Sequence, residues 1–322
     1  MVAPVRLPAG VTVGHHTDRE AWTGCTAVLF PEGCVAAADV RGGGPGTREM
    51  DLLAPSAHAP GINALLLTGG SAFGLAAASG VVAFLEERGI GFPTPGGAVP
   101  LVSAAVVYDL VLGDAAIRPD AAAGRAACAA ASAELARGSV GVGTGCTVGK
   151  LRGPGGWTKG GLGAATATAG DATITAIAAV NALGDVLGGD GRVLAGVWTG
   201  EGYARSVDLL RRGERPRTPW REATTLVCVV TDARLDKREA WLTARAGTAG
   251  VARAVEPSAT PFDGDLVVCA ATGAVPEDPF VVSVLAADVV TEAIRDAVEQ
   301  ATGAPGCPSA GERAASSLGD DP

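Results

Sequence analysis

The chain has 322 residues, 48% of them hydrophobic and only 4% aromatic, so it can bury a sizeable core packed mainly through small side chains. Its formal net charge is −9, and no basic stripe that could neutralise the phosphates of a nucleic acid stands out against this acidity. These properties predict a folded globular protein and argue against nucleic acid as a partner.

The N-terminal residues and the cysteines predict a cytoplasmic protein. Residues 1–20 lack the charged start and apolar run of a signal peptide, and the longest apolar stretch, residues 72–85, is too short to span a bilayer. The seven cysteines are an odd number without CxxC spacing, which favours free thiols in a reducing compartment over a zinc site. We therefore expect no membrane span, no metal and no cofactor.

Strands and helices are interspersed along the chain. Apolar, β-branched runs bounded by Gly, Asp and Pro predict mostly buried strands at residues 26–30, 64–68, 104–107, 173–180, 193–197, 226–231 and 266–271. Helical periodicity predicts helices at residues 73–88, 120–137, 236–254 and 281–302. Because the strand runs are apolar on both faces, the sequence predicts a layered α/β sandwich whose sheets are covered by helices.

Two segments are poor material for a core. Residues 206–222 are rich in Arg and contain Pro216 and Pro219, which predicts a solvated, flexible loop leading into the strand that begins at Thr225. Residues 303–322 are rich in Pro, Gly, Ser and Asp, which predicts a disordered tail. We thus expect a single domain over residues 1–302.

Two short motifs resemble known functional loops but lack key residues. Residues 144–151 resemble a phosphate-binding loop, but Thr144 replaces its first Gly and Leu151 replaces its final Ser or Thr. Residues 69–74 resemble a nucleophile elbow, but Phe73 stands where the closing Gly should be. The sequence therefore favours neither nucleotide binding nor an elbow-type serine hydrolase.

The scarcity of histidine favours a nucleophile that carries its own base. The chain has only His15, His16 and His58, which we expect on the surface or in loops. If a chain is cut just before a Thr, the freed α-amine, with a reference pKa of about 8, can accept the hydroxyl proton. Thr224 follows the predicted loop and heads a buried strand, although a Thr-Thr pair is also good strand sequence.

Five motifs occur in one order along the chain. They are residues 41–49 (RGGGPGTRE), 68–75 (TGGSAFGL), 143–150 (GTGCTVGK), 180–185 (VNALGD) and 261–265 (PFDGD). In this order they resemble the DmpA-like peptidase family, which includes L-aminopeptidase/D-Ala-esterase/amidase, β-peptidyl aminopeptidases and nylon-oligomer hydrolase. The resemblance extends over residues 9–300. We expect the Gly-rich segments to shape the backbone around a pocket, without a catalytic role.

The resemblance implies an αββα sandwich, related to that of ornithine acetyltransferase and made as a precursor that cuts itself. In this chain the cut would fall between Ala223 and Thr224, giving an α chain of residues 1–223 and a β chain of residues 224–322. Thr224 would be the nucleophile of self-cleavage and of hydrolysis, and its new α-amine would be the general base.

Five further residues receive roles from the resemblance. Asn181 would donate a hydrogen bond to the oxyanion, and Tyr108 would supply a further oxyanion contact. Lys150 would lie close to the nucleophile, where its charge lowers the pKa of the amine and of the hydroxyl. Asp263 and Asp265 would point the same way, pair with Lys150 and orient the amine.

Each of these residues also has an ordinary structural interpretation. Asn181 and Asp263 are common turn residues, Lys150 after a Gly suits a solvated loop, and Tyr108 suits a half-buried aromatic position. Only the joint pattern favours function.

The resemblance predicts an amidase or aminopeptidase for small amides or short peptides, assembled as a homo-oligomer that is by family analogy a tetramer. The alternatives are a Thr-dependent acyltransferase of the ornithine acetyltransferase type and an uncleaved binding protein on the same scaffold. Ala223 departs from the family pattern, in which Asn or Gly often precedes the nucleophile. A chain that did not cut itself would have no α-amine at Thr224.

Overall fold

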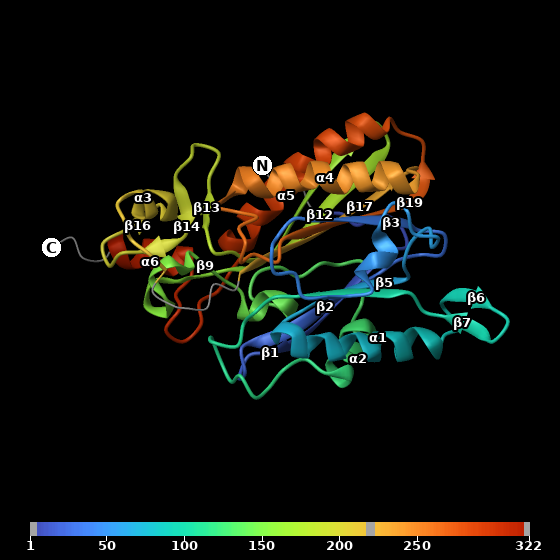
Figure 1. The fold of residues 1–322 in the computed structure, drawn as a ribbon, viewed down its shortest axis with the longest axis horizontal. Helices are drawn as coiled ribbons and strands as arrows, with labels where there is room; N and C mark the ends of the chain where they lie inside the picture. The colour runs from blue at the N-terminus through green and yellow to red at the C-terminus, as the bar shows by residue number, and fades with distance from the viewer. Residues whose placement is uncertain (1–4, 217–222, 319–322) are drawn as a thin grey trace.

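Two five-stranded sheets stacked face to face form the body of the protein (Figure 1). The computed structural model describes residues 5–216 and 223–318. The first sheet consists, in spatial order, of β1 (Thr12–Asp18), β2 (Thr23–Leu29), β5 (Ala64–Thr68), β8 (Val102–Val106) and β4 (Thr47–Arg48). The second consists of β11 (Gly161–Ala169), β12 (Ala172–Asn181), β17 (Thr224–Ala233), β19 (Leu266–Val275) and β3 (Val35–Val40).

Helices cover the outer face of each sheet, so the layers run helix, sheet, sheet, helix (Figure 1). The first sheet is covered by α1 (Ala77–Glu86) and α2 (Ala121–Ala129), and the second by α4 (Lys237–Ala254) and α5 (Pro279–Glu299). None of the described helices combines the length and the apolar character needed to cross a membrane. The predicted αββα sandwich is confirmed.

The central strand β17 shows why the strand runs are apolar on both sides. Leu226 and Cys228 belong to the core between the two sheets, whereas Val227 and Val229 belong to the core beneath α4 and α5. Successive side chains of a strand point to opposite faces, and both faces of this sheet are covered. Thr224, two residues before Leu226, therefore points into the layer between the sheets.

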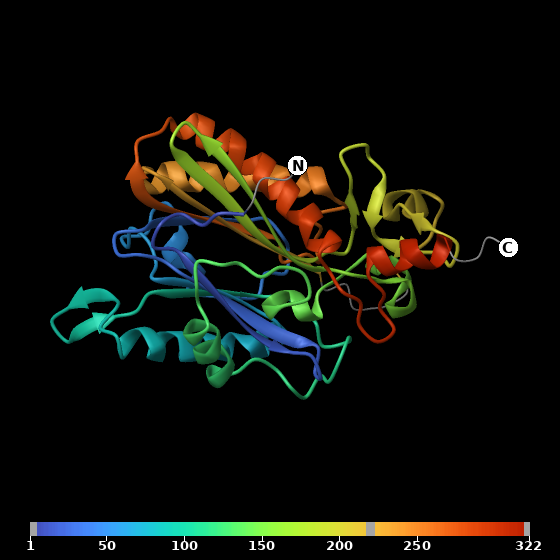
Figure 2. The same cartoon turned by 180° about the vertical axis from the view of Figure 1, so that it is seen from behind.

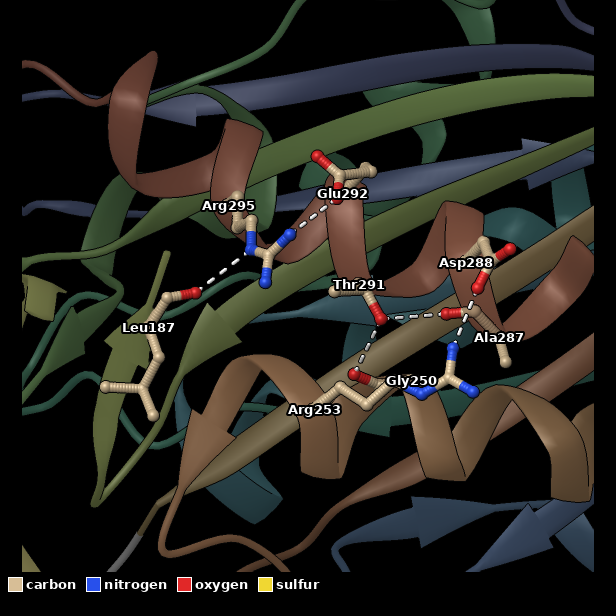
Figure 3. Close-up of polar contacts among 8 residues, drawn as sticks. All are labelled: Leu187, Gly250, Arg253, Ala287, Asp288, Thr291, Glu292 and Arg295. Atoms are coloured by element: carbon tan, nitrogen blue, oxygen red, sulfur yellow. Dashed lines mark hydrogen bonds and ion pairs between the residues drawn. The ribbon is translucent and has the colours of Figure 1, made fainter. Parts of the chain in front are cut away.

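Helices α4 and α5 approach closely at a glycine (Figure 3). A Cβ atom on Gly250 would lie 2.3 Å from the carbonyl oxygen of Ala287. The Thr291 hydroxyl donates to the carbonyl oxygens of Gly250 (3.2 Å) and Ala287 (2.9 Å), and Arg253 forms an ion pair with Asp288 at 2.7 Å. Gly250 thus allows the close approach of α4 and α5, the two helices that cover the outer face of the second sheet.

A smaller lobe lies at one end of the sandwich (Figure 2). It includes β9 (Thr147–Val148), β10 (Thr158–Lys159), β13 (Asp185–Leu187), β14 (Val193–Ala195), β15 (Val197–Trp198), β16 (Tyr203–Ala204), α3 (Ser206–Arg211) and α6 (Ala310–Leu318). Strand β18 (Val255–Glu256) joins β13, and the hairpin of β6 (Phe92–Thr94) and β7 (Gly97–Val99) projects at the opposite end (Figure 1). Short 3-10 helices are η1 (Met50–Leu53), η2 (Ser71–Ala76), η3 (Gly141–Gly145), η4 (Lys150–Arg152) and η5 (Pro154–Gly156).

The C-terminal residues differ from the predicted disordered tail. Helix α6 packs onto the smaller lobe through Arg313, whose Nη2 donates to the Trp157 carbonyl oxygen at 2.7 Å and whose guanidinium lies 4.7 Å from the Trp198 ring centroid. Cys307 and Ser309 are also buried. The prediction is therefore wrong for residues 303–318, because a few buried side chains anchor a segment of disorder-promoting composition; residues 319–322 lie outside the described residues.

The predicted solvated loop at residues 206–222 also begins with ordered structure. Residues 206–211 form α3, and Leu209 packs against Leu151 and Val197 in a small core of the lobe. This short helix was not predicted because its apolar residues are few and lie among many Arg residues. Residues 217–222 lie outside the described residues.

Other differences have local causes. The helix predicted over residues 120–137 ends at Ala129, because Ser132 exchanges backbone hydrogen bonds with Val13 of β1. Strand β11 was not predicted, since its sequence GLGAATATA is poor in the branched residues that mark strands. His15 and His16 lie on β1 rather than in a loop, and burial lowers the pKa of His15 to about 4.

The close approach of α4 and α5 generates a stability prediction. Gly250→Ala should lower the free energy of unfolding by about 1–3 kcal/mol, because the new methyl group collides with the backbone of α5. The matched control is Gly311→Ala in α6, where a Cβ atom meets nothing within 4 Å. The control should be neutral or gain up to about 1 kcal/mol from helix propensity. Urea unfolding checks both; equal loss in both variants would contradict the packing account.

Candidate active site at the head of strand β17

The candidate nucleophile and the candidate oxyanion donor face each other across two strands. Thr224, the first residue of β17, is in antiparallel register with Asn181, the last residue of β12. Opposed residues of antiparallel strands direct their side chains to the same face. That face is the layer between the sheets, where Ala179 and Leu226 are also buried. Thr224 is 6% exposed and Asn181 is fully buried.

The Thr224 hydroxyl lies against the peptide that precedes it. Its Oγ1 donates to the carbonyl oxygen of Ala223 at 2.6 Å, and the backbone N–H of Gly264 donates to the same oxygen at 2.8 Å. Ala223 also forms a parallel bridge with Asp263, which extends the pairing of β17 with β19 towards the N-terminus of both strands. The Ala223 side of the Ala223–Thr224 bond is thus held by the backbone that precedes β19, and the Thr224 side is paired with Asn181 of β12.

The Asn181 side chain is oriented by two backbone groups. Its Oδ1 accepts from the Thr147 N–H at 3.0 Å, and its Nδ2 donates to the Tyr108 carbonyl oxygen at 3.0 Å. Thr147 belongs to the GTGCTVGK motif and Tyr108 follows β8, so both sheets contribute. The amide nitrogen carries two hydrogens, so the second one can donate to another acceptor.

Lys150 is a buried cation beside this pair. It is 7% exposed, and its Nζ donates to the backbone carbonyl oxygen of Asn181 at 2.9 Å. The Trp157 ring centroid lies 5.9 Å from Nζ, and the Trp157 Nε1 donates to the Lys150 carbonyl oxygen at 3.4 Å. Lys150 therefore does not occupy the solvated loop position that is usual for a lysine after glycine.

The two aspartates before β19 hold different groups. Asp265 accepts from the Thr225 N–H at 2.6 Å and from the Ala259 N–H at 2.9 Å, whereas Asp263 accepts from the Thr260 N–H at 2.8 Å. Burial, together with the charge of Asp263, raises the pKa of Asp265 to about 7. Burial also raises the pKa of Asp263, against the opposing effects of hydrogen bonds from Thr260 and the positive charge of Lys150. Asp265 thus fixes the residue that follows Thr224.

Sequence reasoning missed Lys159, a fully buried lysine that supports the segment containing the GTGCTVGK motif. Its Nζ donates to the carbonyl oxygens of Gly143 (2.8 Å), Cys146 (2.9 Å) and Gly160 (2.9 Å). Burial lowers its pKa to about 8. The chain has only three lysines, so a lysine between Thr158 and two glycines was a usable signal.

A second residue that sequence reasoning missed is Asp109, the neighbour of Tyr108. Its buried carboxylate accepts from the Thr23 hydroxyl and from the Gly70 N–H, both at 2.7 Å. Burial raises its pKa. A Cβ atom at Gly69 would lie 2.1 Å from this carboxylate, so the TGGS motif needs glycine there. Asp109 thereby fixes the carbonyl group that orients Asn181.

Within residues 5–216 and 223–318, no three His, Cys, Asp or Glu side chains come together in a group that could hold a metal ion. All seven cysteines are buried free thiols, and burial raises the pKa of each.

The chain is similar to proteins whose names describe amide-bond hydrolysis. The profile described as Peptidase family S58 matches residues 8–307. A Mycobacterium tuberculosis protein named as an uncharacterized aminopeptidase is 41% identical over 289 residues, which cover 84% of this chain and 81% of the relative. A 6-aminohexanoate-oligomer endohydrolase of Agromyces sp. is 31% identical over 272 residues, which cover 82% of this chain and 73% of the relative.

Two solved structures share the fold. A Burkholderia sp. beta-aminopeptidase has a TM-score of 0.72 and 22% sequence identity, covering 100% of this chain and 97% of its own. The L-aminopeptidase D-Ala-esterase/amidase of Ochrobactrum anthropi has a TM-score of 0.71 and 20% identity, covering 99% and 94%, and is described as a variant of the Ntn hydrolase fold.

Lys159 provides a direct test of how the site loop is supported. Lys159→Met should lower the free energy of unfolding by at least about 2 kcal/mol, because three buried carbonyl oxygens each lose one hydrogen bond and the Gly160 oxygen loses the donor that Lys159 gives it. Lys237→Met is the matched control: Lys237 also donates to two carbonyl oxygens, those of Leu52 and Ala59, but from a partly exposed position where water can replace it. Chemical unfolding checks the pair, and a smaller loss for Lys159→Met than for the control would contradict this role.

Proposed function

The chain belongs to peptidase family S58 and is a hydrolase, and we propose that it is a self-cleaving amidohydrolase whose nucleophile is Thr224. One observation carries the proposal: the buried Thr224 hydroxyl is hydrogen-bonded, at 2.6 Å, to the carbonyl oxygen of the peptide that would break. A hydroxyl next to its own preceding peptide is the arrangement that an N-to-O acyl shift requires.

Self-cleavage would proceed through an ester. The Thr224 Oγ1 attacks the carbonyl carbon of Ala223, the C–N bond breaks, and the hydroxyl proton ends on the nitrogen of Thr224. Water then hydrolyses the ester, which leaves the Ala223 carboxylate and a free α-amine on Thr224. The products are residues 1–223 and 224–322, and the paired strands would hold them together after the cut.

Hydrolysis of a substrate would use the same hydroxyl with the new amine as its base. The amine takes the hydroxyl proton while Oγ1 attacks the substrate carbonyl carbon, and it returns the proton to the leaving amine. The remaining hydrogen of the Asn181 amide is the candidate donor to the oxyanion, since Tyr108 and Thr147 already fix the orientation of that amide. Water then releases the acyl group from Thr224.

The charged residues support the same scheme. The positive charge of Lys150, which reaches the backbone of Asn181, favours the neutral form of the amine that must act as a base. Asp265 binds the N–H of Thr225 and so keeps the start of the new chain in place. We assign Asp263, beside Ala223, to orienting the amine, and Tyr108 to a further oxyanion contact.

The proposed substrates are small amides or short peptides. The similar proteins are named as aminopeptidases and as 6-aminohexanoate-oligomer endohydrolases, which share amide-bond hydrolysis. We further propose a cytoplasmic homo-oligomer, a tetramer by family analogy, that works without a cofactor. Product analysis with and without an added amine acceptor separates hydrolysis from acyl transfer: the free acid should remain the main product in both.

Three variants at the start of β17 test the nucleophile. Thr224→Ala should remain a single chain of 31.7 kDa and lose amidase activity by at least about 10³-fold, because the attacking hydroxyl is gone. Thr224→Ser should still cut itself, since the hydroxyl is retained. The matched control is Thr225→Ala, which keeps the backbone N–H that donates to Asp265. This variant should cut itself normally. Intact-mass measurement reads all three.

The outcomes separate the rival assignments. A folded wild-type chain that stays uncut would leave the amine-based mechanism without its base and favour a binding protein. If Thr225→Ala stays uncut while Thr224→Ala is cut normally, the nucleophile is Thr225 and not Thr224.

A further inference from the structure

The carbonyl oxygen of Ala223 has a second hydrogen-bond donor, and this donor plays no part in the hydrolysis scheme above. The backbone N–H of Gly264 lies 2.8 Å from that oxygen. Attack on the Ala223 carbonyl would place a full negative charge on this same atom. A backbone N–H already at hydrogen-bond distance needs no rearrangement to stabilise that charge.

We propose that the Gly264 N–H is the oxyanion donor for self-cleavage, distinct from Asn181, which serves substrate hydrolysis. The inference rests on the proposed self-cleavage at Ala223–Thr224. In the tetrahedral intermediate the new Oγ1–C bond has formed, the C–N bond is still intact, and the charge sits on the Ala223 oxygen. Collapse breaks the C–N bond, and the nitrogen of Thr224 takes the hydroxyl proton.

The topology of the sheet separates the two donors. In the second sheet, β17 lies between β12 and β19. Asn181 belongs to β12, whereas Gly264 immediately precedes β19 on the other side of β17. Because the Ala223 carbonyl oxygen accepts from Gly264, it points to the β19 side, away from the strand that carries Asn181.

Glycine is required at position 264 by its contact with the nucleophile. A Cβ atom there would lie 2.8 Å from Thr224 Oγ1 and 3.3 Å from Thr224 Cγ2. Only a residue without a side chain lets the 263–264 peptide come this close to the hydroxyl without displacing it. The N–H and the reacting hydroxyl can therefore meet on one carbonyl group.

The RGGG motif holds the donor loop in position. The Gly44 N–H donates to the Asp263 carbonyl oxygen at 2.9 Å, which belongs to the same peptide unit as the Gly264 N–H. A Cβ atom at Gly42 would lie 2.0 Å from that carbonyl oxygen, and one at Gly43 would lie 2.4 Å from the Pro261 carbonyl oxygen. The glycine run thus lies directly on residues 261–265 and fixes the peptide whose N–H faces Ala223.

The test replaces the donor atom alone. Cell-free synthesis with glycolic acid at position 264 exchanges the N–H for an ester oxygen and leaves every side chain unchanged. The matched control carries glycolic acid at Gly188, whose N–H donates to the Arg192 carbonyl oxygen at the same 2.8 Å but lies in a turn between β13 and β14. Each chain is followed by intact mass over time, with circular dichroism to verify folding.

Self-cleavage of the Gly264 ester chain should be slower than wild type by about 10²- to 10³-fold, the usual loss for one oxyanion donor. The Gly188 ester chain should cut at the wild-type rate. In molecules that have already been cut, amide hydrolysis should fall by less than about tenfold, because Asn181 serves that step.

Self-cleavage of the folded Gly264 ester chain at the wild-type rate would overturn the inference while leaving the proposed function intact. Equal losses in cleavage and in hydrolysis would overturn the separation of the two donors. A wild-type chain that never cuts would overturn the proposed function itself. If the ester chain does not fold, the second variant carries glycolic acid at Gly44, which removes the N–H that holds the 263–264 peptide at 2.9 Å and adds no side chain near Thr224; it should also cut itself more slowly than the Gly188 ester chain, and cleavage at the wild-type rate would count against the inference.

Discussion

The site depends above all on the hydrogen bonds that hold strand β17 between its neighbours. β12 pairs with β17 in antiparallel register from Thr224 to Thr231, and β19 pairs with it in parallel register from Leu226 to Ala233. This pairing sets Thr224 opposite Asn181 and brings Gly264 to the carbonyl of Ala223. Breaking one peptide bond just before the strand would remove none of these pairs, so the geometry proposed for self-cleavage would also serve hydrolysis.

Buried polar side chains hold the irregular segments around this strand. Lys159 donates to the carbonyl oxygens of Gly143 and Cys146, in the segment that leads to Lys150, and to that of Gly160. Asp109 connects the segment after β8 to Gly70, and Asp265 binds the N–H of Thr225. Glycine residues have no side chains that could anchor these segments, and buried backbone groups without partners are costly. A few charged groups thus position the site, and each is costly to remove.

The layered architecture and the grouping of the candidate residues could be predicted from the sequence, but the polar supports could not. Apolar runs such as residues 226–231 indicated sheets covered on both faces, and the family resemblance implied that Lys150, Asp263 and Asp265 lie near Thr224 and Asn181. Strand β11 escaped prediction because Gly and Ala, which make up most of its sequence, carry little strand signal, and α6 because its anchors lie among disorder-promoting residues. The glycines of residues 42–44 were expected only to shape backbone; the peptide that they hold is visible only in three dimensions.

Cleavage of the Ala223–Thr224 bond, which would free an amine on Thr224, can be read from the chain termini of the purified, folded protein. Chemical labelling of α-amines followed by peptide mass analysis reads every N-terminus at residue resolution. Self-cleavage predicts a labelled terminus at Thr224 in stoichiometric amount with the original N-terminus. A single labelled terminus at the start of the chain, or a new terminus at any other residue, would contradict it.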